Sequence, residues 1–154
     1  MRRALSENNN MATVGSIVER EVEKPIDREK TCPLLLRVFC NTGRHHMLSE
    51  YARGNTPANE LQIYTWLDAT LKELMSLVKE VNVDARRKGT YFDFAIVTPD
   101  SRSPVYRMNE IGSTCAGMKG KDDSVTLASK RFQIGDYLDI AITPPHLNRR
   151  ARPY

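Results

Sequence analysis

The chain has 154 residues, of which 40% are hydrophobic and 27% are charged, and these proportions are typical of one folded domain with short tails. No run approaches the roughly 20 consecutive apolar residues of a membrane span, and the first ten residues lack the apolar centre of a secretory signal. We therefore expect a soluble intracellular protein that folds without a disulfide or a metal.

The formal net charge of +4 is unevenly distributed. Residues 1–10 sum to +1 and residues 146–154 to +3, so residues 11–145 are neutral. A neutral body argues against a folded nucleic-acid groove, which needs clustered lysine and arginine. The alternative is weak, salt-sensitive RNA binding by the basic tails. Their arginines are Arg2, Arg3, Arg149, Arg150 and Arg152.

Five strands are predicted along the chain. Residues 1–30 are poor in apolar side chains and are expected to be disordered or loosely docked. The apolar run over 34–40 predicts a first strand, which the Asn-Thr-Gly sequence at 41–43 closes as a turn. Alternating apolar residues predict the other strands over 61–66, 90–97, 105–111 and 137–143.

One helix is predicted between the second and third strands, from apolar residues at helical spacing. These residues are Leu67, Leu71, Leu74, Met75, Val78 and Val81. Either a capping box from Thr65 to Asp68 or an N-cap at Asp68 would begin the helix. A basic last turn at 86–88 precedes Gly89.

This order of elements predicts an α+β domain over residues 31–145, with a mixed sheet and the one main helix across one face. A ubiquitin-like β-grasp roll has this order. The domain would be followed by a basic tail over residues 146–154.

Three cysteines without paired spacing indicate a reducing compartment. Cys32 and Cys40 could be combined with the histidines at 45 and 46 as zinc ligands, but their spacing is unlike that of zinc sites. We interpret the His45-His46 pair as a solvated hairpin tip and the two cysteines as buried small hydrophobic residues. No metal site is predicted.

Other patterns that resemble catalytic or cofactor sites are also incomplete. The glycine-rich segment 112–120 lacks the residue order and following helix of a phosphate loop. Ser113 and Cys115 have no histidine expected nearby to activate them. Asp136 and Asp139 should point to opposite sides of a strand. The sequence predicts no enzyme activity, no catalytic residues and no cofactor.

The strand pattern divides the apolar side chains between two faces of the sheet. The helix is expected to cover Leu34, Leu36, Val38, Leu61, Ile63, Phe92, Phe94, Ile96, Leu138, Ile140 and Ile142. The opposite face would carry Leu35, Phe39, Tyr64, Tyr91, Val97 and Tyr137. Because such an apolar, aromatic face has few charges, a partner surface is favoured over cover by long loops such as 98–130.

Several long stretches of the sequence resemble one known family. They are KPIDREKTCPLLLRVF at 24–39, GRHH at 43–46, ELQIYTW at 60–66, DATLKEL at 68–74 and FQIGDYLDIAITPP at 132–145. Shorter matches lie at 110–114, 119–123 and 152–154. The chain resembles the small Sin-associated polypeptide family, subunits of the Sin-type histone deacetylase corepressor complex.

This resemblance implies a ubiquitin-like fold without catalytic activity and two nuclear roles. One is transcriptional repression through the deacetylase complex. The other is regulation of pre-mRNA splicing at the exon junction complex, together with Acinus or Pinin and an RNA-binding Ser-rich RRM protein. The expected location is the nucleus, in speckles, with the cytoplasm left open as a second location.

The hypothesis is therefore an adaptor that holds an extended partner segment at a sheet edge or groove. The expected contacts are Leu35, Phe39, Tyr64, Trp66 and Tyr91. In the loop 112–123, partner contact by Lys119, Asp122 and Asp123 is weighed against plain turn chemistry. A conjugated ubiquitin-like modifier is the less favoured alternative, because the chain ends in Arg-Pro-Tyr rather than glycine.

Overall fold

The computed structural model describes residues 25–99 and 106–147, and the sequence predictions for residues 1–24 and 148–154 lie outside that part. The predicted order of strands and helix is confirmed. The main elements are β1 (Leu34–Thr42), β2 (Glu60–Thr65), α2 (Leu71–Val81), β3 (Tyr91–Pro99), β4 (Tyr106–Cys115) and β5 (Tyr137–Thr143). The short 3-10 turns are η2 (Leu48–Gly54), η3 (Val83–Arg86), η4 (Ala128–Lys130) and η5 (Pro145–Leu147).

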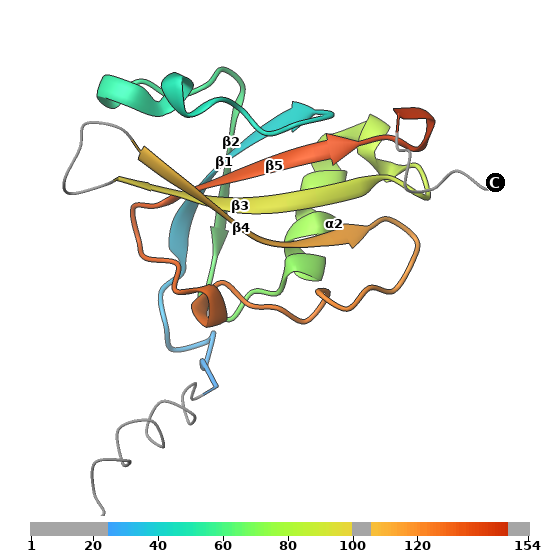
Figure 1. Ribbon diagram of the computed structural model, residues 1–154. Helices are drawn as coiled ribbons and strands as arrows, with labels where there is room; N and C mark the ends of the chain where they lie inside the picture. Colours follow the sequence, from blue (N-terminus) through green and yellow to red (C-terminus); the bar gives the residue numbers. More distant parts are fainter. Residues whose placement is uncertain (1–24, 100–105, 148–154) are drawn as a thin grey trace, which may run out of the picture.

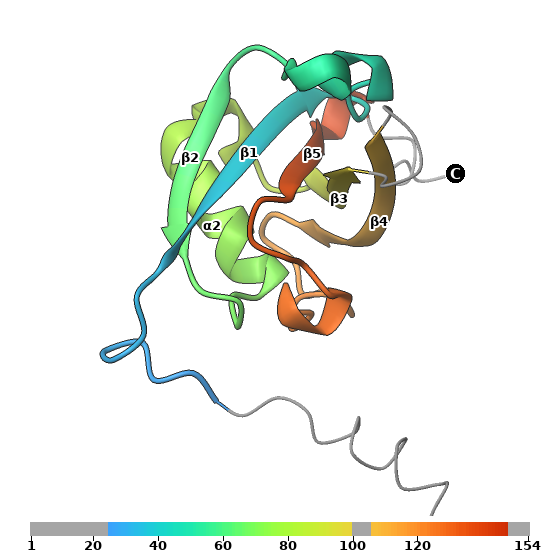
Figure 2. The same cartoon turned by 90° about the vertical axis from the view of Figure 1, so that its left-hand side faces the viewer.

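The strands form one mixed sheet in the order β2-β1-β5-β3-β4. The central pair β1 and β5 is parallel, and the other neighbouring pairs are antiparallel. Figures 1 and 2 show α2 lying across one face of the curved sheet. This is the α+β, ubiquitin-like roll that the sequence predicts. Within the described residues, no helix is long and apolar enough to cross a membrane.

The side chains expected under the helix form the main core, which confirms that part of the prediction. Leu36, Val38, Phe92, Phe94 and Ile140 are wholly or almost wholly buried against the apolar face of α2. Leu34 at the start of β1 and Leu61 in the edge strand β2 are only partly buried. A strict alternation along each strand places these residues on a single face.

The predicted start of the helix is wrong by one turn. The amides of Leu127 and Ala128 donate to the carbonyls of Ala69 and Leu67, at 3.1 and 2.9 Å, and hold residues 67–69 outside the helix. Thr70 is therefore the N-cap, and its hydroxyl accepts the amide of Glu73 at 3.1 Å. Neither Thr65 nor Asp68 caps α2.

The helix also ends earlier than its basic flank suggests. The last helical residue is Val81, and the chain then forms the separate turn η3. Arg86 folds back from that turn and donates to the carbonyls of Lys79 and Glu80, at 2.6 and 2.9 Å. The cation thus binds the carbonyl end of the helix without being part of it.

Replacing Thr70 by alanine should lower the free energy of unfolding by about 1 kcal/mol, because the Glu73 amide loses its acceptor. Thr70→Ser keeps a hydroxyl in the same place and is expected to stay close to wild type. Urea denaturation monitored by circular dichroism measures both variants. Equal stability of the alanine and serine variants would contradict the assigned cap.

Candidate partner-binding site

The sheet face opposite α2, here called the outer face, is covered over its centre by residues of the chain itself. Tyr51 of η2 lies over Phe39 and Val97, and all three side chains are fully buried. The Phe39 and Tyr51 rings meet edge to face with centroids 5.6 Å apart. Tyr106, Met108 and Tyr137 pack around them. We call these six residues the aromatic cluster.

The aromatic cluster corrects the favoured expectation that the aromatic residues of this face form a partner surface, because residues of the chain itself cover its centre. Phe39 is inaccessible, so it is not available to a partner on this surface, and Val97 is equally hidden. The cover comes from η2, together with Tyr106 and Met108 of β4. It does not come from a loop within 98–130 alone. No periodic pattern in the sequence marks Tyr51, because it lies in an irregular segment between two strands.

Beside the aromatic cluster, Asp139 of β5 is wholly buried and surrounded by donors. The Nδ1 atoms of His45 and His46 lie 2.8 Å from its two carboxylate oxygens. The backbone amide of His46 donates at 3.3 Å, and the Tyr51 hydroxyl donates through a short hydrogen bond. We call Asp139, His45, His46 and Tyr51 the Asp139 cluster.

Burial and hydrogen bonding oppose each other in the Asp139 cluster. Burial would raise the pKa of Asp139, but the bonds from His45, Tyr51 and His46 outweigh it and hold that pKa below its ordinary value. Burial would likewise lower the pKa of His45, but the Asp139 carboxylate raises it. Burial and the same carboxylate raise the pKa of the Tyr51 hydroxyl. The cluster is therefore arranged around an ionised carboxylate.

The cluster overturns the interpretation of His45 and His46 as a solvated hairpin tip. Their side chains are only 15% and 9% exposed. The two aspartates considered as a pair were expected to lie on opposite sides of one strand, but Asp136 lies before β5, in a turn where it accepts the amide of Gln133 at 3.0 Å. The sequence signal that could have located the cluster is the acidic residue inside the apolar run of β5.

The outer face remains open at the other end of β1. Leu35 and Tyr64 are directly opposite each other in the antiparallel register of β1 and β2. Leu35 is 37% exposed and Tyr64 is 67% exposed. Because β2 is an edge strand with β1 as its partner, an extended segment could add to it there. We call Leu35, Tyr64 and the adjoining Trp66 the edge patch.

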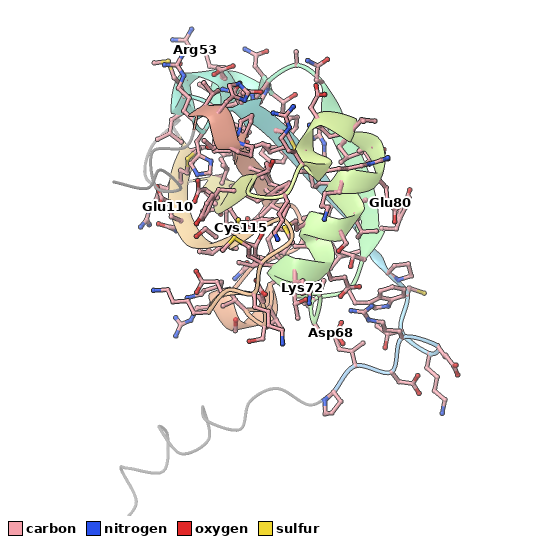
Figure 3. All side chains as sticks on the ribbon, turned by 90° about the vertical axis from the view of Figure 1, so that its right-hand side faces the viewer. Arg53, Asp68, Lys72, Glu80, Glu110 and Cys115 are labelled. Atoms are coloured by element: carbon pink, nitrogen blue, oxygen red, sulfur yellow. The ribbon has the colours of Figure 1, made fainter. Side chains whose placement is uncertain are left out.

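The Trp66 side chain is held by residues that precede β1 in the sequence. Its indole Nε1 donates to the carbonyl of Thr31 at 2.7 Å, and the Arg28 guanidinium stacks 4.8 Å from its ring centroid. Arg28 also bonds Asp68 and Glu73, at 2.7 and 2.8 Å. Figure 3 shows Asp68 beside the blue segment that precedes β1. Residues 28–31 therefore pack onto the domain, and Trp66 is only half-exposed.

Two arginines near the edge patch, Arg28 and Arg37, are paired with carboxylates. Arg37 forms two bonds with Glu60, at 2.5 and 2.8 Å, and stacks 5.1 Å from the centroid of Tyr137. Arg28 is held by two carboxylates, as described above. The edge patch is thus an apolar surface next to neutralised charges, which suits an apolar segment better than a polyanion.

The remaining predicted contacts lie elsewhere. Tyr91 is half-buried near the opposite end of the sheet. Lys119 is exposed in the turn after β4, whereas Asp122 and Asp123 accept the amides of Ser113 and Gly120, both at 3.0 Å. These bonds give the two aspartates a structural role as turn residues, and partner contact by them stays a prediction. The fold therefore does not gather all eight residues into one surface.

The cysteines differ from their predicted burial. Cys32 is exposed, and Cys40 is half-buried. Burial raises the pKa of the Cys40 thiol to about 12, with a smaller contribution from the nearby Asp139 charge. Among the described residues, no group of three or more histidine, cysteine or acidic side chains has a geometry that could hold a metal ion.

Removing the carboxylate should destabilise the protein strongly. Asp139→Ala leaves Tyr51, His45 and His46 without an acceptor, and each unsatisfied buried group costs roughly 1–3 kcal/mol. We expect a loss of about 3 kcal/mol or more in the free energy of unfolding. Asp136→Ala, which removes an aspartate from an exposed turn bond, is the matched control. Similar losses for the two variants in urea denaturation would contradict the proposed role of Asp139.

The contribution of His45 to stability should depend on pH. Its pKa is raised above 6.5 in the folded state, so its contribution is full below that value and is lost as the pH rises through the folded pKa. The pKa of Asp139 is lowered from 3.8, so its contribution is lost only as the pH falls below that value. Glu110 and Asp93 also raise the pKa of His45.

We therefore expect the stability difference between wild type and His45→Gln to be largest near pH 5 and to shrink towards about pH 9. Urea denaturation across that range measures it, and His146→Gln, at an exposed histidine, is the control. A stability difference that grows with pH would contradict the predicted direction of the pH dependence of the His45 contribution.

Comparison with known proteins places this arrangement in a family. The model of the family described as Sin3 associated polypeptide p18 (SAP18) matches residues 25–142. That range runs from the Arg28 segment almost to the end of β5. It therefore includes the edge patch, the aromatic cluster and the Asp139 cluster.

Curated relatives match over most of their length. The protein from Homo sapiens named histone deacetylase complex subunit SAP18 is 66% identical over 142 residues, covering 89% of this chain and 93% of the relative. Its namesake from Drosophila melanogaster is 63% identical, covering 94% of this chain and all of the relative. The namesake from Arabidopsis thaliana is 53% identical, with 80% and 82% covered. Because the family model matches residues 25–142 and each of these relatives is at least 53% identical over at least 80% of this chain, the chain belongs to the Sin3 associated polypeptide p18 (SAP18) family.

Proposed function

We propose that this protein is a non-catalytic subunit of a histone deacetylase corepressor complex and acts in transcriptional repression. The observation that carries the proposal is its 66% identity, over 142 residues, to a relative named for that complex. The burial of the chemically reactive side chains supports an adaptor role. His45 and His46 both form hydrogen bonds with Asp139 inside the domain. The location proposed with this role is the nucleus.

The edge patch is the proposed docking surface. An apolar segment in extended conformation would add to β2 through main-chain hydrogen bonds and place side chains against Leu35 and Tyr64. Tyrosine and tryptophan provide large contact areas with few rotatable bonds, which favours them in interface centres. Arg28 keeps the Trp66 ring in one orientation before binding, which lowers the entropy cost of association.

A second proposed role is in pre-mRNA splicing, in the exon-junction-associated complex with Acinus or Pinin and an RNA-binding Ser-rich RRM protein. This role rests on the resemblance of the stretches at 24–39 and 132–145. Both roles require the same kind of protein surface. The sequence resemblance does not indicate which part of the surface binds the deacetylase partners and which part binds the splicing partners. One experiment should therefore follow both sets of partners.

The test is affinity purification of the tagged full chain from nuclear extract. We expect the wild type to recover histone deacetylase activity, and Leu35→Ser combined with Tyr64→Ser to recover about tenfold less. Met47→Ser, which changes a similarly exposed apolar residue immediately before η2, should retain full recovery. Immunoblots for Acinus and Pinin follow the splicing partners in the same samples.

The outcomes separate complex membership from the choice of surface. A wild type that recovers no deacetylase activity would contradict membership. Full recovery by the double variant, with an unchanged melting temperature, would contradict the edge patch as the docking surface.

A further inference from the structure

A groove crosses the end of the domain opposite the edge patch. It consists of two adjoining hollows of about 630 and 400 Å³, both lined by Val83 and Asp84 of η3. The larger hollow reaches Arg87 and Leu147, and the smaller one reaches Leu61 and Val81. Figure 1 shows η5, in red, beside the yellow-green segment that follows α2. The edge patch lies at the start of β1, whereas the groove lies at its end, with Thr42 in the lining.

Aliphatic side chains are exposed along the whole groove. Val81 is 61% exposed, Val83 is 66% exposed and Leu147 is 52% exposed. They come from the end of α2, from η3 and from η5, so three separate elements contribute to one apolar strip. An apolar strip of this kind within a polar rim is typical of a protein-binding site.

Two segments of the sequence carry an excess of positive charge, and one of them, residues 84–88, lines the groove. Residues 84–88 carry three cations and one carboxylate, for +2, and residues 146–154 carry three arginines, for +3. Because the whole chain is +4, the other 140 residues sum to −1. The segment 84–88 at the groove therefore attracts negative charge, although the domain as a whole is close to neutral.

Two features near the groove could repel an acidic ligand. They are the carbonyl end of α2, which is already neutralised, and the Asp84 carboxylate. The carbonyl end of α2 is bonded by Arg86 through the Lys79 and Glu80 oxygens. Asp84 is the acidic residue of the lining, and it lies two positions before Arg86 and three before Arg87. Arg87 is exposed and forms no ion pair among the described residues. The groove thus combines an unpaired cation with aliphatic side chains.

We propose that this groove is a second docking surface, which binds an acidic peptide segment of a partner that also carries aliphatic side chains. Carboxylates of the segment meet Arg87 and the neighbouring basic residues, and its aliphatic side chains pack on Val81, Val83 and Leu147. The lining favours a peptide over RNA, since it contains no phenylalanine, tyrosine or tryptophan on which bases could stack. The inference does not depend on the edge patch or on membership of a deacetylase complex.

The test uses the full chain and a fluorescein-labelled peptide in which glutamate alternates with leucine, with fluorescence anisotropy as the readout. We expect saturable binding that weakens as salt increases. Arg87→Glu should weaken it about tenfold and Val83→Ser about fivefold, because one removes the charge attraction and the other an apolar contact. Both residues are exposed, so the melting temperature should not change.

The matched controls lie away from the groove. Lys72→Glu makes the same charge change at the other end of α2, where Figure 3 labels it, and Met47→Ser removes an exposed apolar residue elsewhere. Both should bind the peptide as tightly as wild type. Tyr64→Ser should also bind normally, which separates this surface from the edge patch.

Five outcomes would overturn the proposal. Equal binding by wild type and Arg87→Glu, or no binding at all, would remove the site. Equal affinity for a ten-residue peptide and a ten-nucleotide RNA, with no effect of Val83→Ser, would indicate a general polyanion surface. Tenfold tighter peptide binding after truncation at Leu147 would identify the chain's own tail as the occupant. A dimer that Val83→Ser dissociates would identify a second copy.

Discussion

Asp139 lies in the middle of the sheet without contact with solvent, and a buried carboxylate is costly unless donors surround it. The donors are His45, His46 and Tyr51, which belong to one short segment between β1 and β2. Because the Tyr51 ring also covers Phe39 and Val97, the segment that compensates the charge also closes the apolar surface beside it. One electrostatic requirement thus determines which part of the outer face is hidden.

The consequence for binding follows from the position of that segment. It covers the centre of the outer face but leaves Leu35 and Tyr64 uncovered at the start of β1. Arg28 and Arg37 near the edge patch are ion-paired. At the far end of the same strand, Arg87 has no ion pair among the described residues and lies beside exposed aliphatic side chains. A domain with these two different ends could hold an apolar segment and an acidic segment at the same time, which suits a subunit that connects partners.

The helix-facing core could be predicted from the sequence, because alternation along the strands decides which side chains share a face. The outer face could not, because its cover depends on Tyr51 and on a tertiary contact between residues 45–51 and Asp139. The same limit explains the helix start, since the pairing of residues 67–69 with 127–128 overrides a good helical pattern. The exposure of Leu35 and Tyr64 could be predicted, whereas the burial of Phe39 and the contact of Arg28 with Trp66 required the fold.

The most direct test of the central claim is nitrogen NMR of the His45 and His46 side chains at about pH 8. A hydrogen bond to an ionised Asp139 keeps the proton on Nδ1, whether the ring is neutral or charged. The structure predicts the Nδ1–H form for both rings, slow solvent exchange of those protons, and loss of both features in Asp139→Asn. Rapid exchange between the two neutral tautomers in the wild-type protein would contradict the account.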